Sequence, residues 1–89
     1  MSSSGALDMH EVRSIDVELR PGLGALAGVM AVLHARAADV AGMTYSCSGG
    51  RARLILKICA SSEAAARLGL LIDRRADVLA VCLPPGATR

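Results

Sequence analysis

The sequence predicts an α+β fold whose strands and helices follow the order βαββαβ. Residues 15–20 alternate apolar and charged side chains, as expected for a strand with one solvated face. After the turn at Pro21–Gly24 the apolar residues recur at helical spacing, which indicates a change from strand to helix. Ser48-Gly49-Gly50 lies between two more alternating segments and indicates a hairpin. The order of elements is therefore that of two βαβ units joined by a hairpin.

Each element has a local signal. Strands are expected at residues 13–20, 40–47, 51–59 and 77–83, and helices at residues 23–37 and 61–74. The apolar stripe of the first helix consists of Leu26, Val29, Met30, Leu33 and Ala37, and that of the second of Ala65, Leu68, Leu71 and Ile72. Ser61 is a suitable N-cap, and Glu63 places a carboxylate in the first turn. These elements predict a four-stranded antiparallel sheet with both helices on one face, the ferredoxin-like arrangement.

The predicted domain covers residues 13–84, between an N-terminal tail at residues 1–12 and a C-terminal tail at residues 85–89. A domain of this size buries only about 60–65% of the surface that its unfolded chain exposes, so its core is marginal. The sheet face away from the helices is expected to be apolar, with Ile55, Leu79, Val81 and Leu83 on it. An exposed apolar face of this kind favours a homodimer.

The outer face of the first helix allows two interpretations. Ala27, Ala31 and Ala38 surround His34 there and form a small, apolar surface. Such a surface either packs closely against a neighbouring backbone or is an exposed alanine-rich helix favoured by propensity alone.

Composition excludes several classes of function. The net charge of +2 is too small to indicate nucleic-acid binding by itself. The sequence has neither an apolar run long enough to span a membrane nor a secretion signal, so no membrane partner and a cytoplasmic location are expected. Cys47, Cys59 and Cys82 lack zinc-site spacing and are expected to be reduced core residues. We expect no metal and no cofactor.

The chain also lacks the residues that several known activities of ferredoxin-like domains require. Tyr45 is the single aromatic residue, and the predicted first and third strands have none on which an RNA base could stack. The first turn has no cysteine for copper, and the absence of asparagine from the chain argues against an acylphosphatase. No nucleophile with a base and no carboxylate pair is found, so no catalytic residues are predicted.

The turn at residues 21–24 is the candidate site. The first amides of a helix have no internal partners and carry a partial positive charge, so a carboxylate or phosphate could approach them. The alternative is that Pro21 ends the strand and the glycines only make a tight connection.

Three segments resemble the ACT domain, and within it the small regulatory subunits of acetolactate (acetohydroxyacid) synthase. Residues 19–30, Leu-Arg-Pro-Gly-Leu-Gly-Ala-Leu-Ala-Gly-Val-Met, are similar to the strand, glycine turn and helix start of an ACT domain. Arg36 and residues 39–44, Asp-Val-Ala-Gly-Met-Thr, resemble the helix end and second strand of those subunits. Residues 71–81, from Leu71 to Asp77-Val78 and Val81, resemble their closing helix and strand.

This resemblance implies a non-catalytic regulatory or stabilising subunit in branched-chain amino-acid biosynthesis. It would act as a dimer, bind an amino-acid effector such as valine, and tune a thiamine-diphosphate-dependent large subunit. By position, the effector-binding residues would be Pro21, Gly22, Leu23, Gly24, Ala25 and Leu26, with Asp39 and Val40 reaching across from the partner subunit. The alternative is a free-standing ACT protein that binds another amino acid and regulates a different enzyme.

Two departures from the family pattern affect this site. Valine-binding members carry asparagine where this chain has Pro21 and Asp39. Proline lacks an amide donor, and aspartate repels a carboxylate while it still attracts an ammonium group. We therefore expect valine binding to be weakened or lost.

Overall fold

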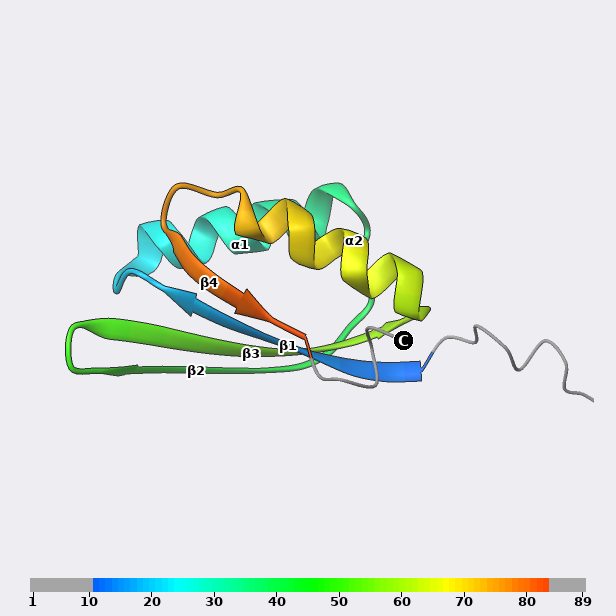
Figure 1. The fold of residues 1–89 in the computed structure, drawn as a ribbon, viewed down its shortest axis with the longest axis horizontal. Coiled ribbons are helices and arrows are strands. Elements are labelled where there is room, and N and C mark those ends of the chain that lie inside the picture. The colour runs from blue at the N-terminus through cyan, green and yellow to red at the C-terminus, as the bar shows by residue number, and fades with distance from the viewer. Residues whose placement is uncertain (1–10, 84–89) are drawn as a thin grey trace, which may run out of the picture.

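The structure, a computed structural model, describes residues 11–83. Its elements are β1 (Glu11–Leu19), α1 (Leu23–Ala35), β2 (Val40–Ser48), β3 (Arg51–Ala60), α2 (Ser62–Asp73) and β4 (Val78–Cys82) (Figure 1). The strands form one antiparallel sheet in the order β2-β3-β1-β4. Both helices cover the same face of this sheet (Figure 1). The predicted α+β, ferredoxin-like βαββαβ architecture is confirmed.

The first strand begins earlier than the sequence suggests. β1 starts at Glu11, so Glu11 and Val12, which were expected in the N-terminal tail, pair with Ala60 and Cys59 of β3. The remainder of that tail and the expected C-terminal tail at residues 85–89 lie outside the described residues.

The first helix ends earlier than predicted. α1 stops at Ala35 because the chain turns at Ala37, whose φ of 51° is left-handed. The amide of Ala38 donates to the Leu33 carbonyl at 2.9 Å, which closes the helix end. Ala37 is therefore exposed rather than part of the apolar stripe, and Ala38 packs against the core rather than on the outer face.

The core lies between the sheet and the two helices. Its strand residues alternate along β1 and β3, as the period of a strand requires, and are Ile15, Val17, Leu19, Ala52, Leu54, Leu56, Ile58 and Ala60. Its helix residues are Ala25, Val29 and Leu33 of α1 and Ala65, Leu68 and Ile72 of α2. The side chain of Ser61 accepts a hydrogen bond from the Ala64 amide at 3.1 Å, so the predicted cap of α2 is confirmed.

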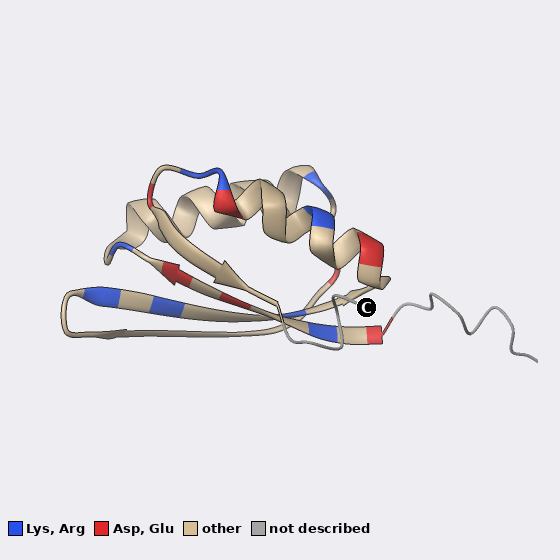
Figure 2. Cartoon of the chain, in the orientation of Figure 1, with Lys and Arg blue, Asp and Glu red and all other residues tan. Residues whose placement is uncertain are grey.

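The sheet face away from the helices carries charges, so the expectation of an apolar face is wrong for the face as a whole, although Ile55, which pairs with Asp16, lies on it as expected. Val81 pairs with Val17, a buried core residue, so Val81 and the neighbouring Leu83 pack on the helix side. On the open face, ion pairs cross from β3 to β1, with Arg51 Nη1 at 2.7 Å from Glu18 Oε2 (Figure 2). This removes the argument that the open face must be covered.

The cysteines are free thiols, but they are not core residues. Cys47 and Cys82 are exposed and Cys59 is half-buried. The first two lie on β2 and β4, the edge strands of the sheet, where less of each strand is covered.

Candidate functional site

The predicted site lies at the bend between β1 and α1, here defined as residues 20–24. The bend is tied to the chain before β4 because the Arg20 amide donates to the Asp77 carbonyl at 2.9 Å. Gly22 has φ 116° and ψ 156°, a conformation that L side chains rarely adopt. It is the N-cap of α1, and no side chain caps the helix there.

The first turn of α1 leaves backbone amides without a partner inside the helix. Pro21 has no amide hydrogen, and the Leu26 amide points back to the Gly22 carbonyl at 3.4 Å. By helix geometry the amides of residues 23–25 have no acceptor within α1. Added Cβ atoms at Gly22 and Gly24 would meet nothing within 4 Å, so the space beside these positions is open.

The side chains of the predicted residues have different roles. Leu23 is 79% exposed, whereas Ala25 is buried and Leu26 packs against the core. Residues 21–24 are exposed and form an open surface. Ala25 and Leu26 hold the start of α1 against the core. The bend therefore offers backbone donors next to one exposed apolar side chain.

Tyr45 contributes to the bend, and sequence reasoning missed it. Its hydroxyl accepts a hydrogen bond from the Gly22 amide at 3.4 Å and another from the Cys47 thiol at 3.3 Å. The hydrogen bond with Cys47 raises the pKa of Tyr45, which the Gly22 amide opposes, so the hydroxyl is neutral at physiological pH. A hydroxyl has one proton to donate, and the raised pKa indicates that this proton is shared with the Cys47 sulfur unless a ligand takes it. The signal available in the sequence was that Tyr45 is its single aromatic residue.

Asp39 and Val40 do not join the bend within one chain. They follow α1 at the end of the helix opposite the bend, as Figure 1 shows. The Asp39 carbonyl accepts from the Cys59 amide at 2.9 Å, and Val40 pairs with Ile58 in the sheet. The predicted site is therefore divided between the two ends of α1.

The groove on the open sheet face is not at the predicted site. It has a volume of about 520 Å³, and Asp16, Glu18, Arg51 and Arg53 are among its lining residues. These four charges pair with one another across β1 and β3, so the groove offers a ligand no unpaired charge from this set. We give this groove no functional role.

Across residues 11–83, no three His, Cys, Asp or Glu side chains are grouped closely enough to hold a metal ion. No helix in the described part of the chain is long and apolar enough to cross a membrane.

Sequence comparison does not identify relatives. No model of a known protein family matches the chain. No curated protein sequence matches it either. The resemblance to acetolactate synthase small subunits is therefore not confirmed.

Solved structures do match. The crystal structure of the ACT domain from GTP pyrophosphokinase of Chlorobium tepidum aligns with a TM-score of 0.73 and 13% identity over 86% of this chain and 99% of that one. The solution structure of the same ACT domain aligns with a TM-score of 0.73 and 12% identity over 84% of this chain and 86% of that one. The C-terminal domain of MgtC from Mycobacterium tuberculosis aligns with a TM-score of 0.66 and 14% identity over 94% of this chain and 92% of that one. A homoserine dehydrogenase from Thiobacillus denitrificans aligns with a TM-score of 0.60 and 16% identity over 83% of this chain but only 17% of that one. Together with the element order and sheet topology, these matches show that the chain has the ferredoxin-like fold of an ACT domain.

Proposed function

We propose that this protein is a non-catalytic regulatory module that acts as a dimer and binds an amino acid at the bend. The observation that carries the proposal is the uncapped start of α1, where helix geometry leaves the amides of residues 23–25 without an acceptor in the helix and the space beside Gly22 and Gly24 is open. Backbone amides at a helix start favour an anion such as a carboxylate. The Tyr45 hydroxyl, next to the Gly22 amide, can add a further donor there when its proton turns from the Cys47 sulfur to a ligand.

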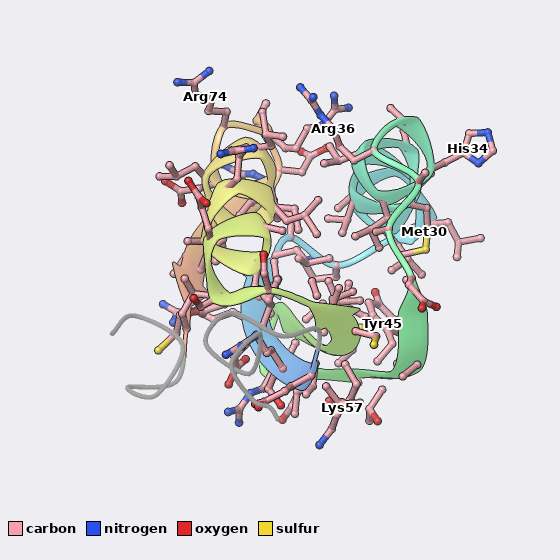
Figure 3. All side chains as sticks on the ribbon, turned by 90° about the vertical axis from the view of Figure 1, so that its right-hand side faces the viewer. Met30, His34, Arg36, Tyr45, Lys57 and Arg74 are labelled. Carbon is pink, nitrogen blue, oxygen red and sulfur yellow. The ribbon has the colours of Figure 1, made fainter. Side chains whose placement is uncertain are left out.

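A surface without charges supports the dimer. Neither α1 nor β2 contains Lys, Arg, Asp or Glu (Figure 2). β2 is an edge strand of nine residues, so its outer backbone groups are open to another strand. Figure 3 shows Met30 and His34 of α1 projecting on the side where β2 lies. A helix without charges beside an open, uncharged strand is suited to a second copy of this chain.

Antiparallel pairing of β2 with its partner's β2 would also reunite the divided site. β2 begins next to Asp39, far from the bend, and ends at Ser48 on the side of the bend (Figure 1). Antiparallel pairing places the start of one strand opposite the end of the other. The partner's Asp39 and Val40 would then approach the bend of this chain, where the Asp39 carboxylate can attract an effector's ammonium group.

The proposal also concerns which enzyme this module regulates. The short segments at residues 19–30, 39–44 and 71–81 favour the large subunit of acetolactate synthase, with valine binding weakened by Pro21 and Asp39. A second candidate is regulation of a different enzyme through another amino acid. It is favoured by the match to an ACT domain that belongs, by its name, to a GTP pyrophosphokinase.

Sedimentation of the purified chain tests the dimer. Ala31→Glu puts a charge on the exposed face of α1, and Leu70→Glu puts the same charge on an exposed position of α2. We expect a dimer for the wild type and the Leu70 variant and a monomer for the Ala31 variant. A wild-type monomer at micromolar concentration would refute the proposal.

Ligand and partner are tested separately. The melting temperature is measured with each of the twenty amino acids, and a stabilising amino acid identifies the effector. A clear rise with valine would refute the weakened valine site. Co-purification of a tagged chain with an acetolactate synthase large subunit supports the first candidate, and its failure alongside a stabilising amino acid supports the second.

A further inference from the structure

A second groove lies at the end of α1 opposite the bend, between that helix end, the end of β3 and residues 64–71 of α2. We call it the distal groove and define it by its lining residues: Arg36, Ala37, Ala38, Asp39, Ile58, Cys59, Ala60, Ala64, Arg67, Leu68 and Leu71. Its volume of about 420 Å³ is within the range of small-molecule sites. Neither the bend nor the uncharged surface of α1 and β2 is needed to form it.

The floor of the distal groove is apolar. Ile58, Ala60 and Leu68 are buried at its base, and Ala64 and Leu71 are half-buried beside them. Four of its lining residues are alanines, whose side chains occupy little of the space: Ala37, Ala38, Ala60 and Ala64. An apolar ligand segment would find a dry surface there.

The rim of the distal groove is net positive. Arg36 follows the last residue of α1, and Figure 3 shows it between the two helices on the side away from the sheet. Arg67 comes from α2, and Asp39 is the single carboxylate among the lining residues. Arg67 also contacts Glu63 at 3.3 Å, an i,i+4 pair with both side chains largely exposed. Exposed pairs of this kind are weak, so a ligand carboxylate can replace Glu63 at little cost.

We propose that the distal groove binds a small apolar carboxylate, with its hydrocarbon chain on the floor and its carboxylate on Arg36 and Arg67. Guanidinium groups bind carboxylates through paired, charge-assisted hydrogen bonds, which gives the head group its place. Each methylene that reaches the floor adds about three- to fourfold in affinity. The site goes beyond the proposed function, and one chain forms it without the dimer or the bend, although it shares Asp39 with the proposed effector site.

Titration of the ¹⁵N-labelled full chain with octanoate, below its micelle concentration, tests the proposal. We expect amide shifts at residues 36–39, 58–60 and 64–71, and tighter binding from hexanoate to octanoate. Absence of binding, shifts confined to the bend, or equal binding of 1-octanol would overturn it. Leucine and 4-methylpentanoate differ by the α-amino group alone, so they show whether Asp39 takes part. Tighter binding of leucine at this groove would replace the simple carboxylate by an amino acid and overturn the ligand class.

Two kinds of variant separate the head group from the chain. Arg36→Gln and Arg67→Gln should each lower octanoate affinity about tenfold, because a charge-assisted hydrogen bond is lost. Arg74→Gln is the matched control, since Arg74 is an exposed arginine at the other end of α2 and outside the groove. Ala64→Met keeps both arginines but fills the floor, and it should abolish the gain with chain length. Equal affinities for all four variants would overturn the proposal. A wild-type dimer that does not bind octanoate would leave the proposed function intact.

Discussion

The Gly22 amide and the Tyr45 hydroxyl lie 3.4 Å apart, which joins the start of α1 to the edge strand β2. This contact brings the candidate effector surface and the candidate dimer edge to one place. A partner strand that pairs with β2 would therefore lie near the donors that face the ligand. In the proposed dimer, this contact would couple effector binding to the pairing of the two β2 strands.

Replacing Tyr45 by Phe should weaken that link while the ring remains. The Gly22 amide loses its acceptor, and an effector loses the hydroxyl proton, so we expect affinity for a stabilising amino acid to fall about two- to tenfold. The effect on unfolding should be small, because the contact is long and the exposed amide can turn to water. Calorimetric titration measures the affinity. Thr44→Val, which removes an exposed hydroxyl from the neighbouring position, should leave it unchanged. An equal loss in both variants would argue against a role for Tyr45.

Replacing Ala37 by glycine should make the folded protein more stable. Its φ of 51° is left-handed, a region that costs an L residue free energy and that glycine enters freely. We expect Ala37→Gly to raise the free energy of unfolding by about 0.5–1 kcal/mol. Urea denaturation followed by circular dichroism measures the change. Ala35→Gly, inside the last turn of α1, should lower stability, and a gain there or a loss at Ala37 would contradict the left-handed turn.

The fold was predictable because its signals are periodic and local. Alternation in β3 put Leu54, Leu56 and Ile58 on the buried face, and Ser61 capped α2 as its position suggests. The end of α1 was not predictable, because an alanine at a left-handed position leaves no mark in the sequence. The charged open face was missed because strand register, which pairs Val81 with Val17, decides which side chains share a face.

The site was predictable in part. Pro21–Gly24 could be recognised as a bend with open donors, since proline and glycine have strong local preferences. Tyr45 was missed because its contact with Gly22 joins residues 23 positions apart in the sequence. The distal groove was also invisible, because the packing of the end of α1, the end of β3 and α2 brings its lining residues together from distant parts of the sequence.

Gly69 should tolerate a methyl group and gain from it. It is buried in α2 beneath β4, and an added Cβ would lie 3.6 Å from Val81 and 3.7 Å from Leu83, ordinary contact distances. Alanine is favoured over glycine inside a helix by about 1 kcal/mol, so we expect Gly69→Ala to raise the melting temperature. Gly28→Ala is a useful comparison, because its Cβ would lie 3.1 Å from Arg75 Nη2 and the guanidinium must shift. The rise in melting temperature should therefore be smaller for Gly28→Ala than for Gly69→Ala. A loss at Gly69 would show that α2 and β4 pack more tightly than these distances indicate.

Acid should weaken the open sheet face through Asp16. The hydrogen bond from Arg53 holds the pKa of Asp16 below its ordinary value, more than burial raises it. A carboxyl with a lower pKa when folded stabilises the folded chain above its unfolded pKa, and this contribution disappears as the pH falls through the folded value. We therefore expect part of the stability present at pH 7 to be lost below about pH 4. The loss should be small, because both side chains of the pair are partly exposed.

The Asp16→Asn variant isolates this contribution. It should lower the urea midpoint at pH 7, and this effect should shrink as the pH falls toward 3, where Asp16 of the unfolded wild-type chain takes up its proton. Asp73→Asn is the control, because Asp73 is an exposed carboxyl at the end of α2. The acid sensitivity should then be reduced in the Asp16 variant and kept in the Asp73 variant. If both variants follow the wild type from pH 7 to pH 3, the Asp16–Arg53 pair contributes nothing to folding, and the open face gains its stability from the strand pairing alone.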